Sequence, residues 1–162
     1  MGYRAVLEVT QETVQDVALA AQQRFNEAST LLTHNHYHSA IYVGGLSAEM
    51  FLKTACFIVG GASLAAPTQA LMAPLKHKSY TPPYKIDWEG GHGLWFWSQE
   101  LLARRRGQGK KTPNRFLQVL AALYGDWFVS MRYRPGSATR DECAAFMHNV
   151  EWLANNHSAL RR

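Results

Sequence analysis

The longest apolar stretch of the chain is AIYVGGLSAEMFLKTACFIVGG, residues 40–61, and its pattern is typical of one long helix. At about 100° per residue, its few polar positions fall within roughly one quadrant of the helix wheel, and we call this set the polar stripe. The polar stripe contains His38, Tyr42, Gly45, Glu49, Lys53 and Cys56. A helix with so little polar surface is expected in the middle of its fold. Because an unpaired buried charge is costly, the polar stripe should have partners or water, and it is the first candidate for a functional site.

Helical patterns flank this stretch on both sides. The glycines at 60 and 61 end the central helix, and the sequence TRDE, residues 139–142, is a capping box that begins the last one. The one alternating segment, YRAVLEV at residues 3–9, is short. We therefore predict an all-α, up-and-down bundle of four to five helices that forms a single domain over residues 1–162. Five helices are expected, at residues 10 or 13 to 32, 40–61, about 94–105, about 113–128 and 140 to about 157, with one short helix around 69–75 in the long connection after the second.

Composition restricts the class of protein. With 47% hydrophobic residues among 162, the chain can build a core, and its net charge of +5 favours an anionic partner. The two cysteines, Cys56 and Cys143, lie in apolar helical segments, which is typical of structural thiols in a reducing compartment. The first residues lack the apolar core of a signal peptide, and Glu49 and Lys53 interrupt the longest apolar run. We expect a cytoplasmic protein that does not span a membrane.

Two interpretations of the polar stripe stay open at this point. In the first, His38, Tyr42, Glu49 and Lys53 line a pocket in the bundle, and the glycines at 44 and 45 let a helix or a ligand come close. In the second, Glu49 and Lys53 form an i,i+4 ion pair on a partly exposed face, which is worth only about 0.2–0.5 kcal/mol.

A second candidate site is the segment between the last two helices, WFVSMRYRPG, residues 127–136. Arg132 and Arg134 lie in a short break before a helix N-terminus, where guanidinium groups and free N–H groups suit a phosphate. The alternative is that Arg132 caps the preceding helix and Tyr133 packs on the core. We favour the anion clamp.

Other polar clusters are less informative. The basic run of Arg104, Arg105, Arg106, Lys110 and Lys111 is expected to be a solvated loop, since no aromatic residue is interleaved with it to stack bases. The alternating histidines 34, 36 and 38 have no carboxylate or cysteine beside them. We therefore predict no metal site and no cofactor.

Three pieces of this sequence, in order, resemble the HEPN family of small helical bundles found in prokaryotic defence and toxin–antitoxin systems. They are EASTLLTHNHYHSAIYVGGLSAEMFLK with Glu49 and Lys53, the sequence HGL that opens a helix at His92, and the break RYRP at 132–135 followed by TRDECAAFMHNVEWL. The resemblance covers residues 20–158. It implies an α-helical bundle, commonly a homodimer, whose function involves nucleotides or RNA.

Many members of that family are metal-independent ribonucleases that use an arginine and a histidine separated by four to six residues. This chain lacks that spacing, and its nearest case is Arg140 and His148, with seven residues between them. Eight helical positions place those two about 12 Å apart along the axis and about 80° apart in direction, too far to meet on one phosphate. The resemblance therefore implies an atypical, non-catalytic member that binds a nucleotide, RNA or partner protein in a polar pocket. The expected ligand-binding residues are Tyr42, Glu49, Lys53, His92, Arg132, Tyr133 and Arg134.

Two further functions remain as alternatives. The first is a ribonuclease-like toxin with a rearranged site, in which Arg132 or Arg134 acts with His92 or His148 of the same or a facing subunit. The second is a dimerising structural companion of a nucleotidyltransferase. Such a companion should expose a large apolar surface, for which the expected residues are Trp95, Phe96 and Trp152.

Overall fold

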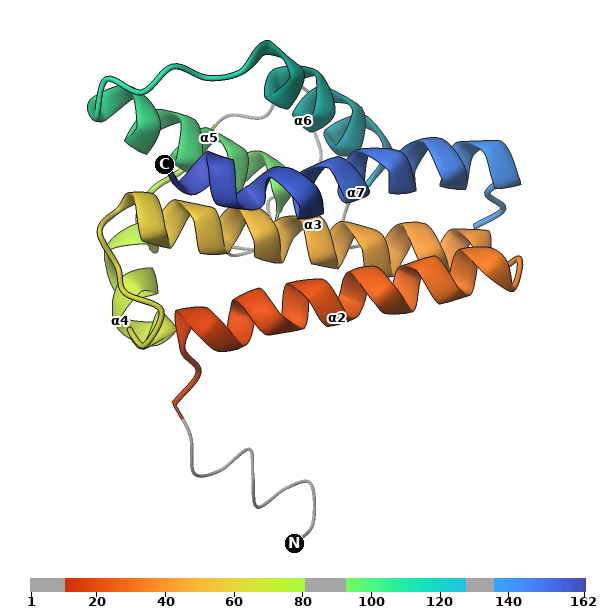
Figure 1. The fold of residues 1–162 in the computed structure, drawn as a ribbon, viewed down its shortest axis with the longest axis horizontal. Helices are drawn as coiled ribbons and strands as arrows, with labels where there is room; N and C mark the ends of the chain where they lie inside the picture. Colours follow the sequence, from red (N-terminus) through yellow and green to blue (C-terminus); the bar gives the residue numbers. More distant parts are fainter. Residues whose placement is uncertain (1–10, 81–92, 128–135) are drawn as a thin grey trace, which may run out of the picture.

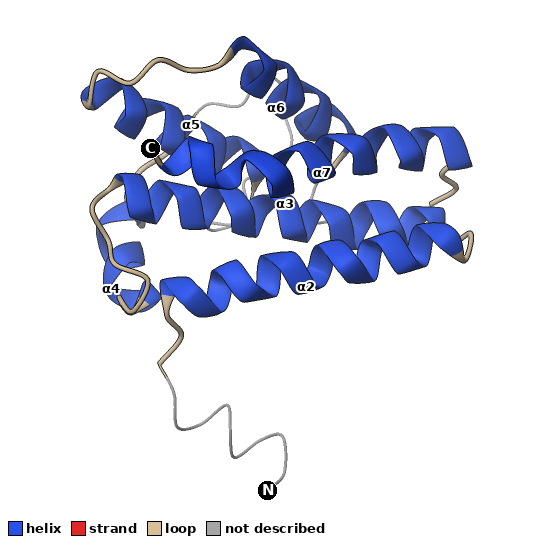
Figure 2. Cartoon of the chain, viewed as in Figure 1, coloured by secondary structure: helices blue, strands red, loops and turns tan. Residues whose placement is uncertain are grey.

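The computed structural model describes residues 11–80, 93–127 and 136–162, and these residues form helices and no strand (Figure 2). The all-α bundle predicted from the sequence is therefore confirmed. The short alternating segment at residues 3–9 lies outside the described residues. The helices are α2 Val14–Thr33, α3 Tyr37–Val59, α4 Thr68–Met72, a 3-10 turn Ala73–Leu75, α5 Leu94–Gly107, α6 Asn114–Asp126 and α7 Arg140–Arg161.

Capping boxes begin the first and the last of these helices. The Thr13 hydroxyl accepts from the backbone N–H of Asp16, and the Asp16 carboxylate accepts from the backbone N–H of Thr13 at 2.8 Å. Thr139 and Glu142 repeat the arrangement at the start of α7, as the sequence predicted. Each box satisfies N–H groups that the first turn of a helix leaves without partners, which fixes where α2 and α7 begin.

The long helix α3 lies in the middle of the bundle, in contact with α2, α5 and α7 (Figure 1). Fourteen of its 23 residues are buried, which confirms the central position expected from its composition. It runs antiparallel to α2, and Ser47 Oγ donates to the Ala21 carbonyl of α2 at 2.8 Å. The C-terminal ends of α3, α5 and α7 all lie at the same end of the bundle.

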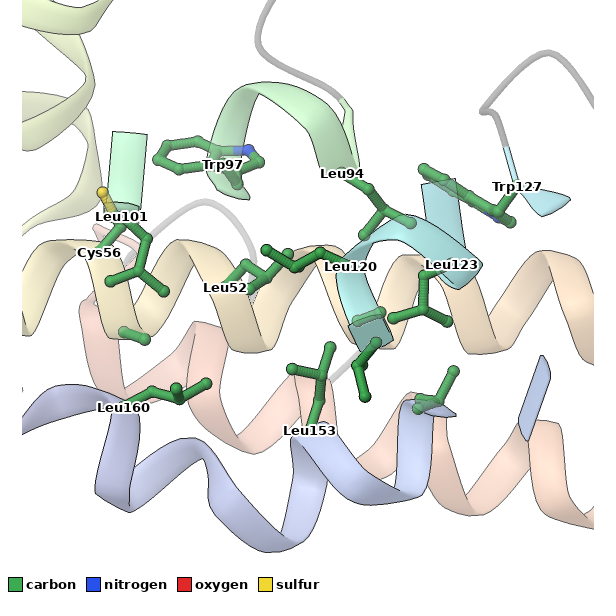
Figure 3. Packing of buried hydrophobic residues seen from close by; sticks show 14 of the residues in the cluster. Leu52, Cys56, Leu94, Trp97, Leu101, Leu120, Leu123, Trp127, Leu153 and Leu160 are labelled. Atoms are coloured by element: carbon green, nitrogen blue, oxygen red, sulfur yellow. The ribbon is translucent and has the colours of Figure 1, made fainter. Parts of the chain in front are cut away.

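Large side chains from α5, α6 and α7 meet over α3 (Figure 3). Trp97, Leu101, Phe116, Leu123 and Leu153 are among the fully buried side chains of this core. Each such side chain contributes about 1.5–3 kcal/mol by leaving water, so this layer holds α5 against α3 and α6 against α5 and α7. The polar stripe therefore has a fixed set of neighbours.

One helix of the described residues, α3, is long and apolar enough to cross a membrane by length and composition alone. Of its most apolar part, 67% is buried inside the protein. A core helix of a soluble protein has this combination of composition and burial.

Candidate functional site

The polar stripe of α3 faces α5 and the end of α6. At its beginning, the indole Nε1 of Trp127 donates to the Tyr42 carbonyl at 3.0 Å. In its middle, Lys53 Nζ lies 5.9 Å from the ring centre of Trp97. At its end, Arg104 donates to the Cys56 carbonyl at 3.1 Å. Neighbouring parts of the protein therefore lie against the stripe at its beginning, middle and end, and the stripe is not a flat exposed face.

The two glycines of α3 are sites of close packing. A methyl group at Gly45 would overlap the indole of Trp127, and one at Gly44 would lie 2.7 Å from Met147 Sδ. Trp127 is the residue that follows α6, and Met147 belongs to α7. The glycines therefore admit neighbouring elements of the bundle, which was one of the two uses expected for them.

Glu49 and Lys53 do not form the exposed i,i+4 pair that was one interpretation of the stripe. Glu49 is only 5% exposed, and the ion pairs of the described residues include no contact between it and Lys53. Lys53 is half-buried and places its ammonium group over the Trp97 ring instead. A cation over an indole face is attracted by the ring quadrupole, so Trp97 offers Lys53 an alternative to the carboxylate.

The expected clamp residues Arg132, Tyr133 and Arg134 and the expected pocket residue His92 lie outside the described residues. The described residues that border the clamp segment are Trp127 and Gly136. Trp127 contacts Tyr42 and Gly45 of α3, and a methyl group at Gly136 would overlap the His38 ring. Both borders of the segment therefore lie against the N-terminal half of the polar stripe.

The catalytic candidate His148 is exposed on α7, as is Arg140 at the start of the same helix. The two belong to one uninterrupted helix, so their separation along the axis is the one expected from the sequence. Within one subunit this pair has no means of meeting on a single phosphate.

A buried carboxylate that sequence reasoning missed lies at the other end of the stripe. Glu100 of α5 is 1% exposed and accepts from Lys78 Nζ at 2.9 Å, from the Tyr80 hydroxyl at 2.6 Å and from Arg104 Nε at 2.7 Å. Burial by itself would raise the pKa of Glu100, but the hydrogen bonds from Tyr80, Arg104 and Lys78 outweigh it, and the pKa is lowered. We call these four residues the Glu100 cluster.

The Cys56 thiol beside the Glu100 cluster and the Tyr80 phenol within it are chemically quiet. Burial raises the pKa of the Cys56 thiol to about 12, with Arg104 acting in the opposite direction. Burial and the hydrogen bond to Glu100 raise the pKa of Tyr80 to about 12 as well. Near neutral pH the thiol and the phenol are protonated and the carboxylate is charged and bonded, so the cluster is suited to stability and not to nucleophilic or acid–base chemistry.

The Glu100–Arg104 pair could have been predicted from the sequence, because the two residues have i,i+4 spacing on an expected helix. The contacts of Lys78 and Tyr80 could not have been predicted, since these residues belong to a connection whose path has no local sequence signal.

The basic run was expected to be a solvated loop, and this was wrong for its first residues. Arg104, Arg105 and Arg106 belong to the last turn of α5. Arg105 is only 5% exposed and donates to the Leu160 carbonyl at 2.6 Å and to the Lys111 carbonyl at 2.8 Å. Helix C-termini leave carbonyl groups without partners, and Arg105 satisfies one at the end of α7.

The apolar surface expected for a structural companion is not formed as predicted. Phe96 is buried at 4% exposure, Trp95 packs against Tyr124 with ring centres 5.1 Å apart, and Trp152 stacks on Phe116. The large hydrophobic side chains that are exposed among the described residues are Leu19, Leu64 and Leu117.

Within the described residues, no group of three histidine, cysteine or carboxylate side chains is placed to hold a metal ion. Comparisons with protein-family models, with curated proteins and with solved structures found no match. The resemblance to the HEPN family therefore stays a prediction from the sequence.

Proposed function

We propose that this protein is an atypical, non-catalytic, HEPN-like module of the cytoplasm that binds a nucleotide or a short stretch of RNA at the polar stripe of α3. The observation that carries the proposal is the position of Trp127 and Gly136, which border the segment with Arg132, Tyr133 and Arg134 and both contact α3. Only eight residues separate Trp127 from Gly136, and a segment of that length cannot extend far from the helix that both borders contact. This supports a clamp whose arginines serve the stripe.

Each proposed ligand residue has a chemical role. The guanidinium groups of Arg132 and Arg134 match two phosphate oxygens at once. Lys53 carries a charge that no described carboxylate neutralises, so it can serve as a second anion contact. The carboxyl oxygens of Glu49 would accept from ribose hydroxyl or base N–H donors. Tyr42, Tyr133 and His92 complete the proposed pocket.

A homodimer is part of the same proposal, as is a nucleotidyltransferase or other partner protein. Neither requires a metal or a cofactor held by this chain.

The proposal is tested by titrating the protein with ATP, with GTP and with a single-stranded RNA of about four nucleotides. We expect saturable binding that weakens at least about tenfold in Arg132→Ala, since a charge-assisted bidentate contact is worth about 1.5–3 kcal/mol. The matched control is Arg140→Ala, which removes an exposed arginine at the start of α7 and should bind the same ligands as tightly as wild type does. Absent binding, or equal loss in both variants, contradicts the proposal.

Incubation of the pure protein with RNA and a chelator separates this proposal from the ribonuclease alternative. We expect intact RNA. Cleavage that persists with the chelator and is lost in both His92→Ala and Arg132→Ala would contradict a non-catalytic module and favour the rearranged Arg/His site.

A further inference from the structure

Two stretches of the chain carry eight of its 17 lysine and arginine residues and no acidic residue. No aspartate or glutamate occurs in residues 101–125 or after residue 151. These two stretches contain Arg104, Arg105, Arg106, Lys110, Lys111, Arg115, Arg161 and Arg162. Without these eight residues the chain would have more acidic than basic side chains, so they account for its positive net charge.

Arg105 joins the two stretches in space. Its guanidinium donates both to the Leu160 carbonyl, at the end of α7, and to the Lys111 carbonyl, in the loop after α5. The two arginines that end the chain are therefore held beside the lysine-bearing loop, and Figure 1 shows the C-terminus next to the end of α5. We use the name basic end for the cations outside the core: Arg106, Lys110, Lys111, Arg115, Arg161 and Arg162.

The basic end has no internal counter-charge in the described residues. The ion pairs among the described residues join Arg24 to Glu27, and Lys78 and Arg104 to Glu100. None of them includes a residue of the basic end. Partial burial also lowers the pKa of Arg161, because the charged guanidinium loses water. Like charges that no acid of the described residues offsets repel one another, so this arrangement costs stability that a bound anion would restore.

Helix dipoles explain only part of this pattern. Arg104 and Arg105 donate to carbonyl groups near the ends of α3 and α7, where cations are favoured. Arg115 is in the first turn of α6, where a cation is unfavourable, and Lys110 and Lys111 lie in a loop. The N-terminus of α6 has no side-chain cap, so its N–H groups add positive potential beside these residues.

We propose that the basic end binds the phosphodiester backbone of a nucleic acid, at a site separate from the polar stripe of α3. Cations carried by the end of α5, the loop after it, the start of α6 and the end of α7 can contact several successive phosphates of one strand. The exposed large hydrophobic side chains of the described residues are leucines, so these residues offer no exposed aromatic surface for base stacking. Binding at this site is therefore governed by charge and is independent of sequence.

The test uses a labelled single-stranded RNA and a labelled duplex DNA, each of about 16 nucleotides or base pairs, at salt concentrations from about 50 to 200 mM. With four to six phosphate contacts, the slope of log K against log salt for the single strand should be about −3 to −4. The double variant Arg106→Glu with Arg162→Glu should lose at least about tenfold in affinity at the lower salt concentration.

The matched control is Arg24→Glu with Arg140→Glu, which makes the same change in net charge away from the basic end and should change affinity less than about twofold. Thermal melts establish that both double variants are folded. Equal losses in the two variants, a slope near zero, or equally tight binding of phosphatidylserine vesicles would overturn the proposal. RNA and DNA results decide which nucleic acid binds more tightly.

This inference is independent of the proposed nucleotide site. Arg106→Glu with Arg162→Glu should leave the affinity for ATP unchanged, and Arg132→Ala should leave the salt slope for the longer strand unchanged. Failure of one site therefore leaves a distinct signature from failure of the other.

Discussion

Two facing helices of this protein carry an acidic residue four positions before a basic one, and the two pairs behave differently. On α5, Glu100 and Arg104 form an ion pair at 2.7 Å, completed by Lys78 and the Tyr80 hydroxyl. On α3, Glu49 is buried, and Lys53 places its charge over Trp97. The spacing is identical, so the surrounding residues decide whether the pair forms. Lys78 and Tyr80 also donate to Glu100, whereas the ammonium group of Lys53 lies over the Trp97 ring.

The difference separates a structural site from a proposed ligand site. In the Glu100 cluster, described side chains of this protein saturate the carboxylate. On the polar stripe, Lys53 has no carboxylate partner among the described residues, and the borders of an arginine-rich segment lie nearby. If this comparison holds, changes in the Glu100 cluster affect folding, and changes at Lys53 affect binding.

The largest effect is expected for Glu100→Gln. This change leaves the partly buried Arg104 and the ammonium of Lys78 without their carboxylate, which should reduce the free energy of unfolding by about 2–4 kcal/mol. Urea unfolding measures the loss. The control is Glu27→Gln, which breaks the exposed pair with Arg24 and should cost at most about 1 kcal/mol. Equal losses in the two variants would remove the structural role assigned to the cluster.

Gly45→Ala tests the other end of the polar stripe. The new methyl group would overlap the Trp127 indole, and the displacement should cost about 1–3 kcal/mol. Gly125 of α6 has no neighbouring atom in the space of a methyl group, so Gly125→Ala should instead raise stability by about 0.5–1 kcal/mol. Urea unfolding of both variants gives the comparison. A harmless Gly45→Ala would mean that Trp127 is not held against α3.

The pH dependence of stability should reflect the Glu100 cluster in acid. The pKa of Glu100 is lowered in the folded state, so its contribution is present above the unfolded pKa of about 4.3 and is lost as pH falls through the folded pKa. Thermal melts of wild type between neutral pH and strong acid should show a steeper loss than melts of Glu100→Gln. Parallel curves would contradict this assignment.

In alkali, the Cys56 thiol and the Tyr80 phenol should lower stability as pH rises. The folded pKa values of Cys56 and Tyr80 are raised to about 12, so the stability they contribute is present below their unfolded values and is lost as pH rises toward 12. Both thiols should also resist alkylation near pH 8 in the native protein, because Cys56 and Cys143 are buried. Rapid labelling without unfolding would refute this.

The smallest change in stability is expected for Lys53→Met. It removes a cation–π contact worth about 0.5–1 kcal/mol but keeps the apolar stem of the side chain, so the net effect on unfolding should be under about 1 kcal/mol. The affinity for ATP or for the short RNA should nevertheless fall, by at least about tenfold. Wild-type affinity in this variant would place the ligand elsewhere.

Local sequence signals were sufficient for most of the fold. The capping boxes at Thr13 and Thr139 and the glycine at 60 fix helix ends through hydrogen bonds made within a few residues. The apolar composition of α3 predicted its burial, because only a central position covers a helix that is apolar on so many faces. These features depend on neighbours in the chain.

Long-range neighbours account for what could not be predicted. The expected exposure of Phe96 was wrong: the side chain is buried, and its ring centre lies 5.6 Å from that of Tyr80 in the connection before α5. Trp97 approaches Lys53, and Arg105 approaches Leu160, only because α5 lies against α3 and the end of α7. Such contacts depend on the path of the chain between helices, for which the sequence offers no comparable signal.

The most direct test measures two quantities in two matched double variants: the melting temperature, and the affinity for ATP, GTP and an RNA of about four nucleotides. For Glu49→Gln with Lys53→Met, we predict lost binding and a melting temperature within about 3 °C of wild type. For Glu100→Gln with Arg104→Met, we predict a melting temperature lower by at least about 5 °C and binding retained at temperatures where the variant is folded. Retained binding in the first variant, or lost binding in the folded second variant, would contradict the assignment of the polar stripe as the ligand site.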